Sequence, residues 1–336
     1  MTIVGVIGCS ALLVSAFGMY DGMNDLKEWE YDQINHYDSK LVIDEDTTQS
    51  EIDDIADKVN GDQIMESAIE IESDSAKKSG LLLVMNETDL VTPTDYGRNH
   101  VEIKNDEVSI SEKMAKMLDV DVGDTVKWHI MGSDKWVKTK IDKTHADPIS
   151  QGFIMSPDKL EDLDLNYTPT SIVTAEHVTK DYDGVKAANS MKDMTSSWDE
   201  MTEAMWLLVY ILIFFACLLA VVVLYNLGLL SFTEIEREIA TLKVLGFKTR
   251  ALRKLLLTQN LWFTAIGFIL GLPTGYYILA ILWESSGDSF YILPSISLTN
   301  FILTAVITFA LSILVNLLFS RKIKKLDMVE SLKGVE

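Results

Sequence analysis

The stretch that decides the fold is Leu255–Trp283, LLLTQNLWFTAIGFILGLPTGYYILAILW, which contains no charged residue. A helix needs about 20 residues to cross a hydrocarbon core, and this stretch is longer. Inside lipid every backbone amide must be hydrogen-bonded within its own segment, so the stretch is predicted to be a membrane-spanning helix. Three further stretches are equally free of charge: Thr2–Tyr20, Ala204–Thr233 and Ser289–Ser320.

Four such stretches predict an α-helical membrane protein with four transmembrane helices plus a mixed α/β extracytoplasmic domain between the first and second helices. A buried core helix of a soluble protein would explain one stretch, but not four. The predicted order is transmembrane helix 1 at residues 1–20, an extracytoplasmic α/β domain with a stalk at 21–203, transmembrane helix 2 at 204–232, a cytoplasmic coupling region at 233–256, transmembrane helix 3 at 257–283, an external loop at 284–298, transmembrane helix 4 at 299–320 and a cytoplasmic tail at 321–336.

The net charge of −21 comes from one region. Asp21–Met205 carries 42 acidic and 18 basic side chains, whereas Ser231–Lys254 and the tail after Ser320 carry six and five Lys or Arg. Short loops rich in Lys and Arg stay in the cytoplasm, so both termini are predicted to be cytoplasmic and residues 21–203 to lie outside. An acidic exterior is typical of a solvated domain and argues against nucleic acid or anionic lipid as its partner.

The first span has the least support, because no Lys or Arg precedes it to set its orientation. A cleaved signal peptide is the alternative, but its basic leader and a clear cleavage site are missing, which favours a retained helix. Both cysteines, Cys9 and Cys217, lie within apolar spans, so no disulfide framework is expected in the α/β domain.

Hydrophobic periodicity in the acidic region predicts mixed α/β structure. The expected strands are Lys40–Ile43, Leu81–Val84, Ser171–Thr174 and a hairpin of Thr125–Ile130 with Lys135–Ile141. The expected helices are Ser50–Val59, Ser109–Leu118 with Ser109 and Glu112 as a capping box, and Ser156–Leu163 with Pro157 in its first turn. The segment from about Tyr182 to Thr202 is expected to form a stalk-like helix that leads into the second span.

No catalytic sequence pattern is present: there is no Gly-x-x-x-x-Gly-Lys-Ser/Thr, no Gly-x-Ser-x-Gly and no His-Glu-x-x-His. The chain is therefore not expected to bind ATP through a P-loop, and no catalytic, cofactor or metal site is predicted. The histidines lack ligand spacing and are expected to be surface or locally bonded groups: His36, His100, His129, His145 and His177. A membrane-anchored ectoenzyme is an alternative that no motif supports.

The predicted spans contain no ionisable residue. Pumps and ion-coupled carriers generally need such residues within their spans, so energy for any transport is expected to come from another subunit. The third span instead carries Gly267, Gly271 and Gly275 on one helical face, a spacing that lets another backbone approach closely. Pro273 within it predicts a kink.

The segment Glu234–Leu245, EIEREIATLKVL, is the best candidate for receiving that energy. It has an apolar stripe and a charged face, which is typical of an amphipathic helix, and Gly246 follows as a C-terminal cap. Two interpretations stay open: a helix that docks on a partner protein, or a helix that lies on membrane lipid at the inner leaflet.

The residues from Arg237 to Phe247, REIATLKVLGF, followed by a glycine-rich span, a final span and Leu326–Lys333, LDMVESLK, resemble the FtsX-like permease domain of bacterial ABC transporters. The resemblance covers roughly Trp198 to the C-terminus, and Val108–Val126 is more weakly similar to a recurring piece of the family's outer domain. Members include the macrolide-exporter and lipoprotein-release permeases.

The resemblance implies a bacterial cell-membrane permease subunit served by a separate cytoplasmic P-loop ATPase that binds the ATP. It implies a second permease unit, as a homodimer or as the other half of a longer chain. It assigns coupling to the ATPase to a set of residues after the second span: Glu236, Arg237, Glu238, Lys243, Gly246 and Phe247. ATP-driven closure would then move the outer domain, a process called mechanotransmission.

The family also contains regulatory members, so a sensory protein that controls a cell-wall enzyme or detects peptides is the alternative function. Two departures stand out: family members usually have a basic amphipathic segment before the first span, and the larger relatives repeat this unit. The substrate is left open between lipid, lipoprotein, peptide and antibiotic.

Overall fold

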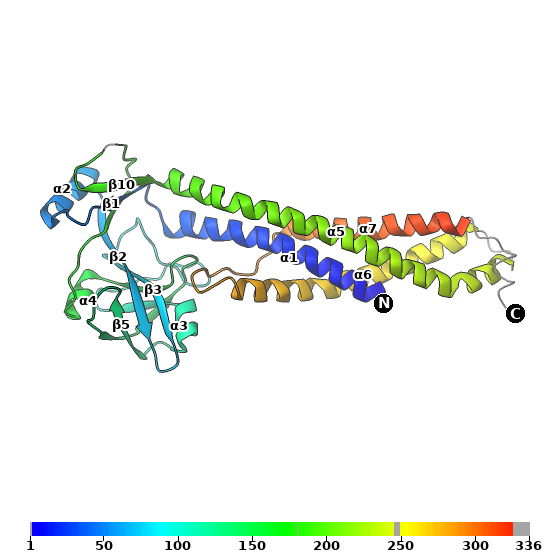
Figure 1. Ribbon diagram of the computed structural model, residues 1–336, viewed down its shortest axis with the longest axis horizontal. Helices are drawn as coiled ribbons and strands as arrows, with labels where there is room; N and C mark the ends of the chain where they lie inside the picture. The colour runs from blue at the N-terminus through cyan, green and yellow to red at the C-terminus, as the bar shows by residue number, and fades with distance from the viewer. Residues whose placement is uncertain (1, 180, 245–248, 325–336) are drawn as a thin grey trace. The chain divides into compact units, whose positions relative to one another are not determined.

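A computed structural model describes residues 2–179, 181–244 and 249–324 of the chain. These residues fall into two compact units (Figure 1). The helical unit comprises Met1–Gly22, Glu203–Trp283 and Leu293–Glu336, and the sheet unit comprises Met23–Thr202 and Glu284–Ile292. The loop that joins the last two helices is therefore part of the sheet unit.

The described part of the sheet unit contains a mixed ten-stranded sheet in the order β10-β1-β9-β2-β3-β8-β4-β7, with β5 paired to β2 and β6. Its strands are β1 Ser39–Ile43, β2 Asp62–Glu72, β3 Lys77–Met85, β4 Val108–Ser111, β5 Thr125–Ile130, β6 Val137–Lys140, β7 Lys143–His145, β8 Gly152–Met155, β9 Ser171–Thr174 and β10 Val185–Ser190. Its short helices are the π-helix η1 Trp29–Ile34, α2 Gln49–Val59, α3 Glu112–Leu118 and α4 Pro157–Asp162.

The long strand β2 holds this sheet together because it pairs with three other strands. It is antiparallel to β3 from Ile64 to Glu72, to β5 at one end and to β9 at the other. Its Ile69 and Ile71 are fully buried with Trp128 of β5 and Phe153 of β8, whose rings meet edge-on at 5.7 Å. This apolar cluster forms the main core of the unit, and a smaller one lies under α2.

Most of the elements expected from periodicity are present. The strands β1, β3 and β9, the β5–β6 hairpin and the helices α2 and α4 lie where the sequence predicts them. Ser156 caps α4 by accepting a hydrogen bond from Lys159 N at 3.0 Å, and Pro157 occupies the first turn. These elements depend on patterns in adjacent residues, so they can be predicted without knowledge of the tertiary fold.

The predicted helix at Ser109–Leu118 is wrong in its first turn. Residues Val108–Ser111 form strand β4, which pairs with β7 and β8, and the helix begins only at Glu112. Ser109 caps nothing: its Oγ lies 2.9 Å from His145 Nδ1 in a buried hydrogen bond. Burial of Val108 and Ile110 in the sheet overrides the capping-box pattern.

The expected stalk also starts later than the sequence suggests. Val185–Ser190 is a strand, β10, antiparallel to β1, and the helix α5 begins at Met191. Ser190 Oγ accepts from Asp193 N at 3.1 Å and donates to the Asp193 carboxylate at 2.7 Å. The sequence from Val185 to Ser190 contains no strong helix breaker, but these residues pair with β1 at the edge of the sheet and so form a strand instead of helix.

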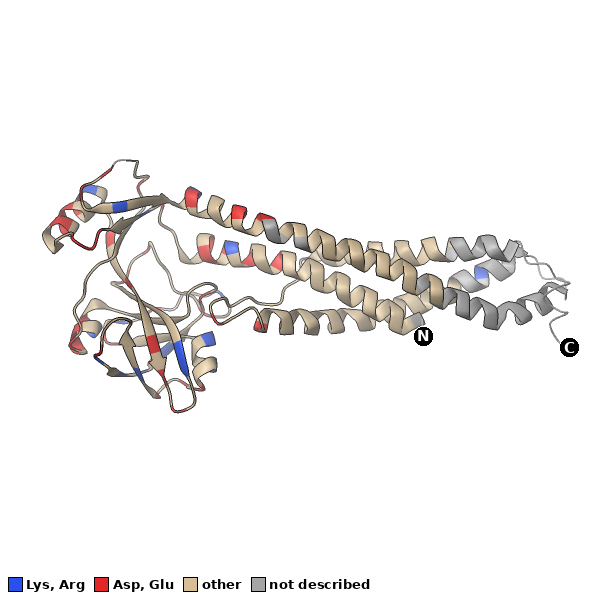
Figure 2. Cartoon of the chain, in the orientation of Figure 1, with Lys and Arg blue, Asp and Glu red and all other residues tan. Residues whose placement is uncertain are grey.

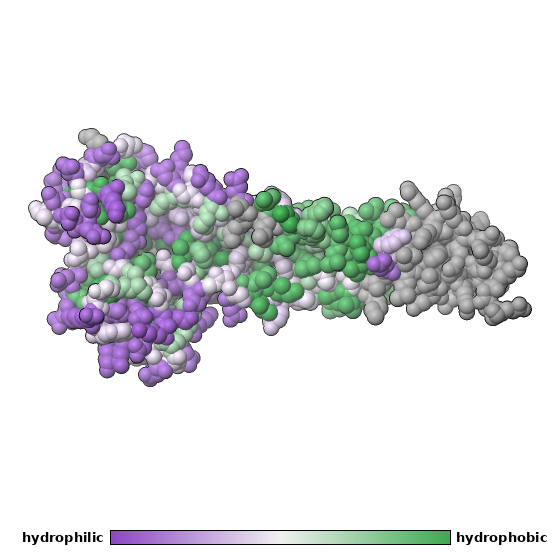
Figure 3. Space-filling model, viewed as in Figure 1, coloured by the Kyte–Doolittle hydropathy of each residue, from purple (hydrophilic) through white to green (hydrophobic). Residues whose placement is uncertain are grey.

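The helical unit contains most of α1 Thr2–Glu28, α5 Met191–Val244, α6 Thr249–Glu284 and α7 Leu298–Lys324. Within the described residues, three helices are long and apolar enough to cross a membrane, with bounds Ile3–Ile34, Thr258–Glu284 and Leu298–Val315. The second predicted span lies in α5, where the described residues contain a shorter apolar stretch, Val209–Val223. Figure 2 shows Asp and Glu on the sheet unit, at the end of α1 and in the first turns of α5, and Figure 3 shows apolar surface on the described part of the helical unit.

Helix α1 is the most enclosed of the spans. In its most apolar window 56% of residues are buried, against 28% in those of α6 and α7. Leu13 and Phe17 pack against Ala216 of α5 and Ile307 of α7.

Two glycines with positive φ differ in the space around them, so substituting each by alanine distinguishes the cost of backbone strain from the cost of a steric clash. Gly152, with φ +157°, lies so close to β3 that an added Cβ would meet Leu81 N at 2.7 Å, whereas a Cβ on Gly132, with φ +89°, would meet nothing within 4 Å. We expect Gly132→Ala to destabilise the chain by about 1–2 kcal/mol through backbone strain. Gly152→Ala should cost about 1–3 kcal/mol more, because the sheet must move apart. Thermal unfolding in detergent, followed by far-UV circular dichroism, measures both, and equal losses would contradict the crowding argument.

Candidate functional site

The glycine stripe of α6 faces helix α1 of the same chain. A Cβ placed on Gly267 would lie 2.6 Å from Val6 Cβ, and one on Gly275 would lie 2.7 Å from Ala11 O. At Gly271 it would overlap the Ser10 hydroxyl. Cβ atoms in real proteins do not approach other heavy atoms this closely, so only glycine permits this separation of the two helices.

Polar groups reinforce the contact between these helices. Ser15 Oγ of α1 donates to Gly275 O of α6 at 3.1 Å, and Ser10 Oγ donates to Val6 O within α1 at 2.7 Å. Small residues that allow close backbone approach, with hydroxyls that bond across the gap, are what drives helix association in lipid, where the hydrophobic effect contributes little. The stripe therefore joins α1 and α6 within one chain.

The segment predicted to couple to an ATPase, Glu234–Leu245, reaches the end of α5. Glu236, Arg237, Glu238 and Lys243 belong to this helix, which runs without interruption from Met191 to Val244. The segment is thus a continuation of the same helix that contains the second predicted span, and is not set off as a separate one. Gly246 and Phe247 lie outside the described residues, and α6 begins at Thr249.

A loop that sequence reasoning passed over, Glu284–Ile292, is bound tightly within the sheet unit. Lys113 Nζ of α3 donates to Gly287 O and Phe290 O, both at 2.5 Å, and Lys78 of β3 pairs with Asp288 at 2.7 Å. Partial burial lowers the pKa of the Lys113 ammonium, although the carboxylates of Asp288 and Glu284 oppose the shift. This lysine therefore serves as a donor to two loop carbonyls.

Tyr291 is the second anchor of this loop. Its amide donates to Pro148 O at 2.9 Å, and its ring lies 6.4 Å from that of Trp29 and 6.0 Å from that of Tyr96. The Lys116 ammonium stands 5.8 Å from the Tyr291 ring centroid. Trp29 is itself 1% exposed and donates to Thr94 Oγ1 at 2.9 Å. Tyr291 therefore contacts an aromatic ring that is held in place by burial and by a hydrogen bond.

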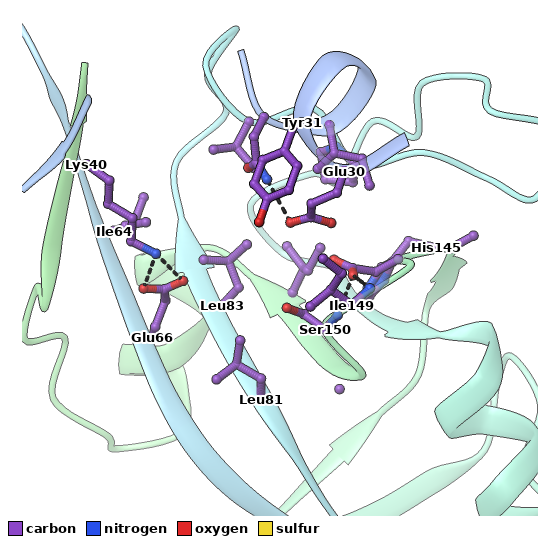
Figure 4. Close-up of a pocket in the computed structure, with 18 of the residues that line it drawn as sticks. Glu30, Tyr31, Lys40, Ile64, Glu66, Leu81, Leu83, His145, Ile149 and Ser150 are labelled. Atoms are coloured by element: carbon purple, nitrogen blue, oxygen red, sulfur yellow. Dashed lines mark hydrogen bonds and ion pairs between the residues drawn. The ribbon is translucent and has the colours of Figure 1, made fainter. Parts of the chain in front are cut away.

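Beside these anchors the sheet unit contains a cavity of about 220 Å³. Its walls come from η1, strands β1, β2, β3 and β8, and the segment around Asp147 (Figure 4). Leu81, Leu83 and Ile64 supply apolar surface. On one wall the Lys40 ammonium is paired with both Glu66 oxygens, at 2.7 and 2.6 Å.

Two carboxyl groups in the cavity are held away from bulk solvent. Asp147 Oδ1 accepts from Ile149 N at 2.8 Å and Ser150 N at 2.5 Å, and burial nevertheless raises the Asp147 pKa to about 6. Glu30, in η1 beyond the charge-free part of α1, accepts from Asn35 Nδ2 at 2.8 Å through Oε1. Burial, and next the charge of Asp147, raise the pKa of Glu30 well above its usual range.

The second oxygen of Glu30 has no such support. Glu30 Oε2 is buried and accepts no hydrogen bond from any described residue. His145, also in the cavity wall, is kept neutral because burial lowers its pKa to about 3. No group of three or more His, Cys, Asp or Glu side chains suited to a metal ion occurs in the described ranges.

The comparisons with known proteins identify the C-terminal part of the chain. Residues 210–328 match the family model of the FtsX-like permease C-terminal domain. These residues are similar to an FtsX-like permease domain. The resemblance drawn from REIATLKVLGF and the spans that follow it is therefore confirmed over this range.

Two other comparisons add less. Among solved structures, a domain of a provisionally assigned permease protein from Porphyromonas gingivalis is 14% identical, with a TM-score of 0.25. The alignment covers 44% of this chain and 77% of that one. No curated protein matches the chain.

The glycine stripe of the permease domain yields a matched pair of substitutions. A Cβ on Gly271 of α6 would collide with Ser10, whereas a Cβ on Gly8 of α1 would meet nothing within 4 Å. We expect Gly271→Val to destabilise the helix pair by about 1–3 kcal/mol because the helices must separate, and Gly8→Val to change stability by less than about 0.5 kcal/mol. Thermal unfolding in mild detergent measures both, and a neutral Gly271→Val would contradict the close contact.

Proposed function

We propose that the chain is the permease subunit of an ABC transporter, in which a separate cytoplasmic ATPase drives motion of the sheet unit. The observation that carries the proposal is the match of residues 210–328 to the FtsX-like permease domain. The absence of ionisable residues from the predicted spans agrees with an external source of energy. This chain would bind no cofactor, and ATP would bind to the partner.

The continuity of α5 supports a mechanical form of coupling. This helix is 54 residues long, roughly 80 Å at 1.5 Å per residue. At its start Met191 N donates to Asp38 O at 2.6 Å, directly after β10 pairs with β1. At its other end it carries the coupling segment, so a displacement of that segment is applied to a helix fixed in the sheet unit. A second helical connection, from α6 to the bound loop Glu284–Ile292, would constrain the same motion.

The proposed arrangement in the bacterial cell membrane has four spans, with α5 supplying the second. Both termini and the coupling segment are cytoplasmic, and residues 21–203 lie outside, in agreement with the charge of the loops. A second permease unit completes the transporter. We propose that the work done is export or extraction of an amphipathic substrate.

Purification tests the partnership directly. The tagged chain, extracted from its native membrane in mild detergent, is expected to carry a P-loop ATPase at comparable abundance, measured by mass spectrometry. An unrelated membrane complex of the same cells, purified in parallel, controls for dissociation by the detergent. If that complex stays intact and the chain carries no ATPase, the permease function is wrong.

Substitution in the coupling segment tests the route. We expect Gly246→Val to abolish stimulation of the partner ATPase, because a β-branched residue resists the positive φ of a helix C-cap. Thr249→Val, a change of similar shape at the start of α6, should leave the stimulation unchanged. ATP hydrolysis by the reconstituted complex is the measurement, with membrane insertion checked for both variants. Equal stimulation in the two variants would remove the coupling role of Gly246.

A further inference from the structure

We propose that the cavity of the sheet unit binds a primary ammonium group carried on a small apolar body, with Glu30 and Asp147 as its counter-ions. The proposal concerns a site apart from the ATPase partnership and stands whether or not the chain is a permease. It rests on the chemistry and the size of the cavity, which together select the ligand.

The cavity contains two carboxyl groups that form no ion pair with a basic side chain of its walls. Glu66 is already paired with Lys40, so the acidic groups left over are Glu30 and Asp147. Each uses one oxygen to hold local structure: Glu30 Oε1 accepts from Asn35, and Asp147 Oδ1 accepts from two backbone amides. Buried carboxylates are stable only when paired and hydrogen-bonded, so a cation is the ligand that such walls favour.

Glu30 Oε2 indicates where the cation sits. Glu30 lines the cavity, and its Oε2 atom is buried and accepts no hydrogen bond from the described residues, although an unmade buried bond costs about 1–3 kcal/mol. An ammonium group has three N–H donors, which can reach Glu30 Oε2, Asp147 and one further acceptor together. The Tyr31 ring lies next to Glu30 in the same wall and adds an aromatic face, a favourable neighbour for a cation (Figure 4).

The rest of the cavity selects an organic ligand over a metal ion. Ca²⁺ takes six to eight oxygens, and no suitable group of three or more acidic, His or Cys side chains exists in the part of the chain that the structure describes. A cavity of about 150 Å³ accommodates benzene, so 220 Å³ leaves room for an ammonium group on a body of similar size. The apolar side chains of Leu81, Leu83 and Ile64 provide the surface for that body.

The same chemistry has two sources, a free amine and the side chain of a lysine in a peptide. Both present a primary ammonium on an apolar chain, so the walls alone do not distinguish them. The test therefore uses one probe of each kind: benzylamine for the free amine, and a short peptide with a central lysine, compared with the same peptide carrying norleucine.

The binding experiment uses the full chain in a non-ionic detergent at pH 7.5, with isothermal titration and empty micelles as the blank. Benzylamine is expected to bind at least tenfold more tightly than benzyl alcohol, which has the same shape without the charge. Glu30→Gln should weaken benzylamine binding at least tenfold, whereas Glu28→Gln, at an exposed acid two residues earlier, should leave the affinity unchanged. Preference for the lysine peptide over free benzylamine would identify a peptide as the source.

A second measurement on the unaltered chain guards against a variant that fails to fold. The titratable groups that line the cavity are Glu30, Asp147, Glu66, Lys40, His145, Tyr31 and Tyr37. His145 stays neutral above pH 5 because its pKa is about 3, so protonation of the carboxyl groups dominates between pH 7.5 and 5. Benzylamine should bind several-fold more weakly at pH 5. Equal binding of benzyl alcohol, no change at pH 5, or no saturable binding of any probe at about 10 mM would each overturn the proposal.

Discussion

The requirement that backbone groups satisfy one another inside lipid determines most of this molecule. It forces the charge-free stretches to be helices and leaves them few means of association, because apolar side chains gain nothing by leaving apolar lipid. What remains is close packing, and α1 and α6 achieve it at Gly267, Gly271 and Gly275. Helix α1 can therefore occupy the middle of the bundle, in contact with the other three helices.

The sequence predicts the parts of the fold that depend on local pattern. Strands such as β1, the β5–β6 hairpin and the capped helix α4 are visible because alternation, a glycine turn or a cap is written in adjacent residues. Strand β2 is missed because Asp62–Glu72 mixes charged and apolar residues, and its burial depends on three partners that are distant in sequence. The same dependence turns Val108–Ser111 from a helix start into a strand, since only β7 and β8 supply the reason for it.

The candidate sites divide in the same way. The glycine stripe can be predicted from the sequence because its three residues lie at helical spacing in one segment. The cavity cannot be predicted from the sequence, because Glu30 and Asp147 are two of 50 acidic residues and no local pattern indicates that either side chain is buried. Only the fold brings η1 and the segment before β8 together. Trp29 and Pro148, the immediate neighbours of these acids, both contact Tyr291, so the loop between α6 and α7 is bonded to the segments that carry the cavity's carboxyl groups.

The buried carboxyl groups also bear on stability. The pKa of Asp147 is about 6 in the folded chain and about 3.9 in an unfolded one, so the folded state binds the proton more tightly. Its contribution to stability is then fully present below about pH 4 and is lost as the pH rises through 6. A domain that works near neutral pH thus carries a penalty at this residue, increased by Glu30 beside it. Natural sequences keep such local penalties mainly at functional sites, and a bound cation removes this one by stabilising the ionised form.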